Sequence, residues 1–320
     1  MKLLDIQNLT VHFPQYESLV QAVRGVSLYL ESGESLGIVG ESGSGKSVTC
    51  LAALRLLQEP PAKISADRLH LAETDMLHAD SRQLACLRGT VAAMVFQDPM
   101  TAFDPVFTIG HQIIETIRSH RDVSKTDARA EAENLLKRVE INQPAVVLDS
   151  YPHQLSGGML QRSMIAMALS CRPQILFADE PTTALDVTIQ AQILQLIKNL
   201  QKEFGMGLVM VTHDLGVIAE TVDRVVVLYG GKVMEQGAVQ DIFDDPLHPY
   251  TKALLASMPG GEAGRSRLIE IKGASPNPAN PPSGCPFHPR CEKAEHRCSE
   301  TAPPMVTRDN NRQAACWVLP

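Results

Sequence analysis

One stretch of eight residues, 40–47, constrains this chain more than any other. It has the form G-x-x-x-x-G-K-S, follows the apolar run 35–39 and opens a helical pattern over 46–57. In that context the backbone N–H groups of the loop and of the helix N-terminus surround a phosphate, while Lys46 reaches the β- and γ-phosphates and Ser47 offers a hydroxyl to Mg²⁺. The alternative, a plain turn between a strand and a helix, does not need Lys-Ser at this offset. The stretch therefore predicts a nucleotide site that contains Gly40, Glu41, Ser42, Gly43, Ser44, Gly45, Lys46 and Ser47.

The composition sets the class of protein. With 320 residues, 44% hydrophobic and 20% charged, the chain fits a soluble globular protein of one large domain or two smaller ones. The net charge of −7 argues against nucleic acid as the main partner. The start of the chain does not look like a secretory signal, and no apolar run approaches the roughly 20 residues that span a bilayer. We therefore expect the chain in the cytoplasm, or on a membrane through a partner.

Polar residues follow several apolar runs that read as strands. Gln97 follows the run 91–96, Asp179 and Glu180 end the run 175–180, and His213 follows the run 208–211. Alternating strands and helices predict a parallel α/β sheet that binds its ligand at the carboxyl edge of the strands. There Asp179 suits Mg²⁺ and Glu180 suits a base that polarises a water molecule. The alternative is a pair of acids that faces solvent at a strand end.

A long helical insert, 108–172, separates two of these strands. Within it, Ser156, Gly157 and Gly158 begin a helix, which predicts a second anion-binding cap, although alone the three residues indicate only a helix N-cap. A further helix begins at Asp186 and stops before Gly205.

Two aromatic residues near the N-terminus could stack on a nucleotide base. Phe13 and Tyr16 lie in the loop that we expect between the first strands, and aromatic packing at a strand end is the alternative.

Together these motifs resemble the nucleotide-binding subunit of an ABC transporter over about residues 1–255. The resemblance implies an α/β fold, a P-loop NTPase cassette with a parallel core sheet, an antiparallel β subdomain and a helical subdomain at about 98–172. A short Cys-rich extension, 256–320, follows it. The matching motifs are the Walker A loop (40–47), the Q-loop glutamine (Gln97), the signature (155–161), Walker B with its glutamate (175–180), the D-loop (184–186) and the switch histidine (His213).

The same resemblance implies roles for single residues. Glu180, His213 and Gln97 are implied in catalysis, and Ser47, Gln97 and Asp179 in holding Mg²⁺. ATP would be bound by the loop 40–47 together with Phe13, Gln97 and Asp179. Ser156, Gly157 and Gly158 would act on the ATP of a partner cassette, with Asp186 at the dimer interface.

A narrower resemblance, carried by the stretches 96–101, 151–154, 179–188 and 248–251, is to the dipeptide, oligopeptide and nickel importers. It implies a heterodimer with a second, related ATPase, two transmembrane permease subunits and an extracytoplasmic solute-binding protein, on the cytoplasmic side of the inner membrane. The segment 101–105 departs from the family's usual Thr-Ser-Leu-Asn-Pro where such subunits meet the permeases. Rival readings are a soluble ABC ATPase that is not coupled to transport and a metal-containing regulatory protein.

The extension carries four of the seven cysteines, Cys285, Cys291, Cys298 and Cys316, at the spacing C-x5-C-x6-C-x17-C. Disulfides are unlikely in the cytoplasm, and zinc usually takes closer pairs, with His288 and His296 as possible substitutes. Four thiolates also hold a 4Fe–4S cluster, and the extension resembles that of peptide importers that bind such a cluster. The cluster is therefore favoured over zinc, and unliganded thiols are the third alternative. Cys50, Cys86 and Cys171 lie in helical patterns and are expected to be small buried hydrophobic residues.

Overall fold

The computed structural model describes residues 1–16, 18–183, 185–258, 271–308 and 311–319. The chain divides into two compact units, which we name the helical unit (79–209) and the sheet unit (2–78 and 210–320). Among the described residues, no helix combines the length and the apolar character needed to cross a membrane.

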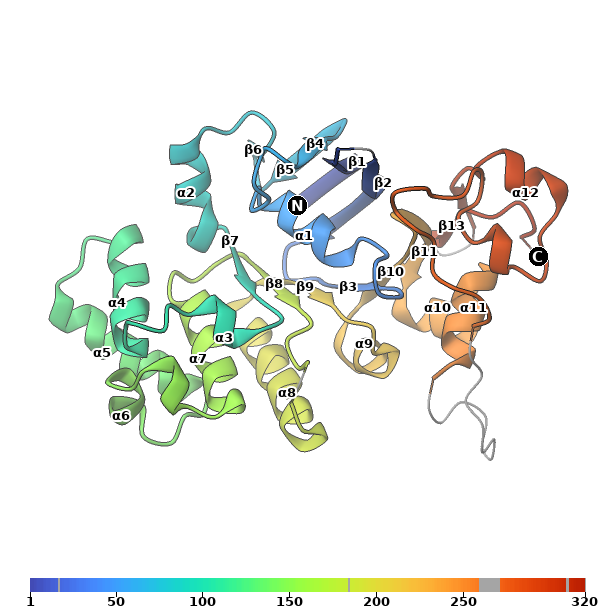
Figure 1. Ribbon diagram of the computed structural model, residues 1–320. Helices are drawn as coiled ribbons and strands as arrows, with labels where there is room; N and C mark the ends of the chain where they lie inside the picture. Colours follow the sequence, from blue (N-terminus) through green and yellow to red (C-terminus); the bar gives the residue numbers. More distant parts are fainter. Residues whose placement is uncertain (17, 184, 259–270, 309–310, 320) are drawn as a thin grey trace. The chain divides into compact units, whose positions relative to one another are not determined.

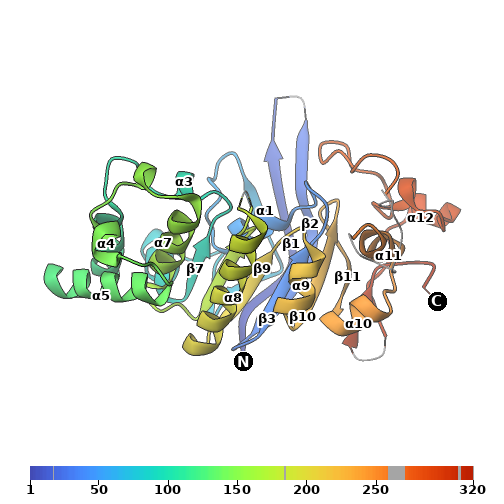
Figure 2. The ribbon, with the colours of Figure 1, turned by 90° about the horizontal axis from the view of Figure 1, so that it is seen from below.

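The sheet unit contains an antiparallel sheet with the strand order β2-β1-β5-β6, in which β4 also pairs with β1. Long strands β1 and β2 form a hairpin that is prominent in Figure 2. This sheet confirms the expected antiparallel β subdomain. Its strands are β1 (Lys2–Pro14), β2 (Leu19–Glu31), β4 (Lys63–Ser65), β5 (Arg68–Leu71) and β6 (Thr74–Asp75).

A second set of strands in the sheet unit has the order β12-β13-β11-β10-β3. Strands β3 and β10 are parallel, as expected for the core of an α/β fold, while β10 and β11 form an antiparallel hairpin. All five residues of β3 are buried, which fits a strand in the interior of a parallel sheet. The strands are β3 (Ser35–Val39), β10 (Arg224–Tyr229), β11 (Lys232–Ala238), β12 (Val306–Thr307) and β13 (Gln313–Ala314).

The described residues of the sheet unit also form six helices, two of them in the C-terminal extension. They are α1 (Lys46–Ala53), α9 (Leu215–Thr221), α10 (Val239–Asp244), α11 (Pro249–Ala256), the short 3-10 helix η2 (His288–Arg290) and α12 (His296–Glu300).

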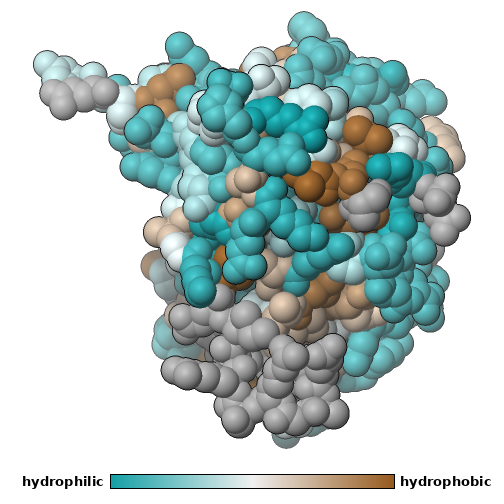
Figure 3. Space-filling view, turned by 90° about the vertical axis from the view of Figure 1, so that its right-hand side faces the viewer, coloured by the Kyte–Doolittle hydropathy of each residue, from teal (hydrophilic) through white to brown (hydrophobic). Residues whose placement is uncertain are grey.

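The sequence gives no periodic pattern for the extension, yet the structure pairs its strand β13 with β11 through Glu235–Ala314 and Gln236–Gln313. The extension is therefore part of the sheet. Figure 3 shows the side of the molecule that carries it, where hydrophilic side chains surround a few hydrophobic areas. The stretch Pro259-Gly260-Gly261, whose composition predicts a linker, lies outside the described residues.

The helical unit gathers α4, α5, α6 and α7 into one cluster, visible in Figure 1. Its strands β7 and β8 are parallel. The elements are α2 (Ser81–Thr90), β7 (Ala92–Val95), α3 (Pro99–Ala102), α4 (Ile109–His120), α5 (Lys125–Arg138), α6 (Pro144–Leu148), η1 (Pro152–Gln154), α7 (Gly157–Leu169), β8 (Ile175–Asp179) and α8 (Val187–Phe204). Strand β9 (Gly207–Val211) crosses the boundary between the units.

The predicted helix after Asp186 is confirmed as α8. Asp186 is its N-cap residue, and Gly205 ends it in the left-handed conformation at φ 63°. One apolar stripe of the helix, which includes Ile193, Ile197 and Leu200, is buried.

Candidate nucleotide site and cysteine cluster

The glycine-rich stretch forms a loop between β3 and α1, as predicted. Gly45 is the N-cap residue of α1 in a left-handed conformation, and no side chain caps this helix end. The positive end of the helix dipole therefore favours an anion at this loop.

Lys46 is buried, and its ammonium group donates to the carbonyl oxygens of Gly40 at 2.9 Å and Glu41 at 3.1 Å. These bonds hold the side chain along the loop. The hydroxyl of Ser44 is buried and has no hydrogen-bond partner among the described residues. A buried hydroxyl is costly without a partner, so a phosphate oxygen suits this position. The loop thus fits a bound triphosphate.

The predicted switch histidine lies in the same unit as the loop. His213 is exposed and follows β9. Next to it, Thr212 donates its backbone N–H to the carbonyl of Ile38 at 3.3 Å, in the strand that leads into the loop. His213 and the phosphate loop therefore follow strands that meet at one edge of the sheet.

The expected position of Phe13 is wrong. Phe13 belongs to strand β1, where it is half-buried and pairs with Val20, because the hairpin continues past the point where the apolar alternation ends. Tyr16 is fully exposed beyond the strand. The structure does not test which of the two residues stacks on a base.

The helical unit brings Gln97 and Glu180 together. The Gln97 amide donates to Glu180 Oε2 at 2.9 Å, and the Thr183 hydroxyl donates to the same oxygen at 2.9 Å. Glu180 has a left-handed backbone at φ 46°, which is strained for a residue with a side chain and is frequent at functional sites. Asp179, at the end of β8, is buried. A carboxylate held in this way, beside a buried second acid, suits the orientation of a water molecule.

The Ser-Gly-Gly stretch caps α7, as predicted. Ser156 is the N-cap residue, and its hydroxyl accepts from the backbone N–H of Met159 at 3.4 Å. Ser156 and Gly157 are exposed, and a Cβ on Gly158 would lie 3.3 Å from Ile189 of α8. This cap can therefore meet a second molecule. Asp186 begins the adjacent helix, whereas Ala184 lies outside the described residues.

The three residues implied in Mg²⁺ binding belong to different units. Ser47 is part of the sheet unit, while Gln97 and Asp179 are part of the helical unit. Their joint role stays a prediction.

The four cysteines of the extension line one cavity of the sheet unit. Burial raises the pKa of the Cys285 thiol to about 11, and burial also raises the pKa values of Cys291 and Cys316. Within the described part of the chain, no three His, Cys, Asp or Glu side chains converge as ligands of a single metal ion. His288 lines the same cavity, while the His296 side chain is 87% exposed. The four thiols therefore share a cavity, but the described residues do not form a converged site for a metal ion of any kind.

The expectation for the other cysteines is partly wrong. Cys50 is buried and Cys171 is half-buried, but Cys86 is exposed, because α2 buries none of its side chains.

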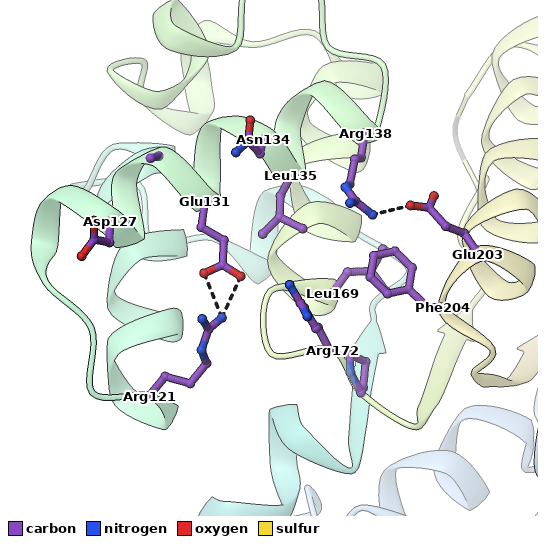
Figure 4. Close-up of a pocket in the computed structure, with 12 residues that line it drawn as sticks. Arg121, Asp127, Glu131, Asn134, Leu135, Arg138, Leu169, Arg172, Glu203 and Phe204 are labelled. Carbon is purple, nitrogen blue, oxygen red and sulfur yellow. Dashed lines mark hydrogen bonds and ion pairs between the residues drawn. The ribbon is translucent and has the colours of Figure 1, made fainter.

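A separate cavity of about 780 Å³ lies within the helical unit and contains none of the predicted site residues. Arg121 pairs with Glu131, and Arg138 pairs with Glu203, so most of its charge is balanced (Figure 4). The cavity does not have the excess of positive charge that a triphosphate requires.

Contacts from the C-terminal extension to the phosphate loop were missed by the sequence analysis. Arg290 donates to the carboxylate of Glu41 at 2.7 Å, across 249 positions of the chain. No local pattern signals a pair so distant.

Comparisons with known proteins identify the family. Residues 23–183 match the ABC transporter family, and residues 234–298 match the oligopeptide/dipeptide transporter C-terminal region. The dipeptide transport ATP-binding protein DppD of Haemophilus influenzae is 47% identical over 95% of this chain and 92% of its own length. The oligopeptide transport ATP-binding protein AppD of Bacillus subtilis is 44% identical over 99% and 96%. A solved dimeric ATP-binding cassette, MJ0796 with ADP and Pi, is 29% identical with a TM-score of 0.64, over 74% of this chain and 98% of that one.

Proposed function

Because this chain belongs to the ATP-binding subunits of ABC transporters, we propose that it hydrolyses ATP to drive the import of peptides or related small solutes. One observation carries the catalytic part: the Gln97 amide and the Thr183 hydroxyl hold the carboxylate of Glu180 at the end of a buried strand. The C-terminal region supports the peptide class of cargo, because it matches a region named for oligopeptide and dipeptide transporters.

We propose these roles for the site residues. Lys46 and the N–H groups at the start of α1 bind the β- and γ-phosphates, and His213 contacts the γ-phosphate. Glu180 orients or deprotonates the attacking water, so catalysis rests on positioning and electrostatics. Mg²⁺, when bound, neutralises charge on the phosphate oxygens, and Ser47, Gln97 and Asp179 would hold it.

We propose that two cassettes act together. The exposed Ser156 and Gly157 suit the closure of a phosphate site on another cassette, and the solved relative MJ0796 is a dimer. In this proposal the second cassette is a different, related ATPase, and both lie on two permease subunits at the cytoplasmic side of the membrane. An extracytoplasmic solute-binding protein delivers the cargo.

Comparing the ATPase activity of the isolated chain with that of the assembled transporter tests this proposal. The isolated chain is expected to bind MgATP and to hydrolyse it slowly, because its phosphate loop lacks an opposing signature. Addition of the second cassette and the permeases is expected to raise the turnover strongly. A full turnover that does not depend on protein concentration, measured with this chain alone, would contradict the two-cassette arrangement.

We further propose that the four cysteines of the extension hold a 4Fe–4S cluster. The chemistry of the donor set fits such a group, because four thiols line one cavity of the sheet unit. Cluster binding would deprotonate thiols whose pKa values burial has raised, with release of protons. The cluster would serve structure or redox sensing, since ATP hydrolysis needs no electron.

Anaerobic purification tests the cluster. The protein is expected to be brown, to absorb near roughly 400 nm, and to contain iron and sulfide. Replacement of any one of the four cysteines should bleach it without abolishing MgATP binding. Colourless protein with one zinc ion per chain would decide against the cluster.

A further inference from the structure

Arg290, in the C-terminal extension, is fixed by hydrogen bonds to other residues of the sheet unit. Its side chain is only 7% exposed. Its Nε and Nη2 atoms donate to the backbone carbonyls of Lys272 and Ile271, each at 2.9 Å. The remaining donor, Nη1, reaches the carboxylate of Glu41 at 2.7 Å and the hydroxyl of Tyr229 at 3.0 Å. The guanidinium group is thus anchored to the extension on one side and reaches the phosphate loop on the other.

Glu41, the second residue of the phosphate loop, is held at three points. Its carboxylate accepts from Arg290 and also from the hydroxyl of Ser275. Its backbone N–H donates to the hydroxyl of Tyr250 at 2.9 Å, and its carbonyl accepts from the Lys46 ammonium group at 3.1 Å. The residue that helps to position the phosphate-binding lysine is therefore itself positioned by the extension.

The segment that carries Arg290 also carries the cysteine cavity. Arg290 ends η2 and directly precedes Cys291. Phe287, two residues after Cys285, packs against the rings of Tyr229 and Tyr250 at centroid distances of 5.3 and 5.2 Å. One short segment, 285–291, therefore contacts the cavity on one side and the supports of the phosphate loop on the other. Because protein interiors are close-packed, a displacement of this segment at the cavity would be transmitted to the supports of the phosphate loop.

We propose that Arg290 is a positioning residue for the phosphate loop and couples the state of the four-cysteine site to the affinity for MgATP. With the cysteine site intact, the segment 285–291 holds Arg290 against Glu41, and Glu41 holds its carbonyl against Lys46. When the cysteine site is lost, the segment shifts, the charged contact loosens and MgATP binds more weakly. This inference rests on the proposed function, since it assigns a regulator to the same ATP site.

The first test measures the dissociation constant of a fluorescent ATP analogue with Mg²⁺ on the full chain. Arg290→Gln and Glu41→Gln are each expected to raise it about tenfold, because a charged hydrogen bond is lost. The double variant should be no weaker than either single variant, because both changes break the same contact. Arg129→Gln is the matched control: this arginine also pairs with a carboxylate, that of Asp149 at 2.9 Å, but it lies in the helical unit outside the proposed sites, and its replacement should leave the constant unchanged.

The second test separates coupling from simple stabilisation. Cys291→Ser should weaken nucleotide binding in the wild-type background and have no further effect in the Arg290→Gln background. Iron content and the absorption spectrum should stay unchanged in Arg290→Gln, which a general collapse of the extension would not allow. An equal effect of Cys291→Ser in both backgrounds, or no effect in either, would overturn the coupling.

Two further outcomes are decisive. If Arg290→Gln does not fold, Glu41→Gln still reports from the loop side, and an unchanged dissociation constant there would overturn the proposal. Lys46→Ala distinguishes a failure of this inference from a failure of the proposed function. If Lys46→Ala loses nucleotide binding while the Arg290 and Glu41 variants keep it, only the inference falls. If Lys46→Ala also binds normally, the ATP site itself is wrong.

Discussion

Gly45 and Gly43 allow a sharp test of how the phosphate loop is built, because both have a positive φ but different surroundings. Gly45 has φ 99°, and a Cβ there would lie 2.5 Å from the backbone carbonyl oxygen of Ala22. Gly43 has φ 77°, and a Cβ there would meet nothing within 4 Å. Alanine at either position is strained by about 1–2 kcal/mol, since the left-handed region is unfavourable for a residue with a Cβ. Only alanine at 45 also collides with the backbone.

The collision gives the expected difference between the two variants. Overpacking in a well-packed region costs about 1–3 kcal/mol. The free energy of unfolding of Gly45→Ala should therefore be lower than that of Gly43→Ala by that amount. For a protein of 320 residues, the difference corresponds to a melting temperature lower by about 1.5–4.5 °C. Gly33→Ala is a control outside the loop, with φ 74° and open space. Thermal unfolding followed by circular dichroism without nucleotide measures all three, and equal melting temperatures for Gly45→Ala and Gly43→Ala would refute the reasoning.

Three other substitutions test separate parts of the sites. Lys46→Ala should weaken MgATP binding by at least about tenfold, because it removes the charge that faces the phosphates; a titration with a fluorescent nucleotide checks this, and unchanged affinity would contradict it. Glu180→Gln should keep ATP binding and lower hydrolysis in the assembled transporter about 10²- to 10⁴-fold; wild-type turnover would remove Glu180 from catalysis. Glu235→Ala should lower the unfolding free energy by about 2–4 kcal/mol, because the buried carboxylate accepts the N–H groups of Leu247 and His248 at 2.7 and 2.9 Å. Urea unfolding measures the last effect, with Glu235→Gln as the variant that retains an acceptor oxygen.

Local patterns in the sequence predict much of the site. The phosphate loop, the cap at Ser156 and the acids after β8 are each signalled by residues within one strand–turn–helix unit, so their chemistry is visible without the fold. The helix α8 is likewise predicted from its ends, because Asp186 and Gly205 carry the conformations that begin and stop a helix.

Contacts between distant parts of the chain were not predictable. The strands β12 and β13 have two residues each, which is too short for any periodicity. The bond from Arg290 to Glu41 joins residues that no spacing rule connects. The place of Phe13 was missed for a related reason, since the length of a hairpin depends on backbone pairing that polar residues also sustain.

The pairing of β13 with β11 bears on how this protein avoids self-association. The backbone groups of Glu235 and Gln236 are satisfied by a strand from the last residues of the chain. A chain shortened before the extension would present β11 as an open edge, and open edges are templates for strands of other molecules. Such a truncated protein should aggregate or exchange strands even with an intact phosphate loop. The extension therefore covers the edge of β11 only once β13 has been synthesised.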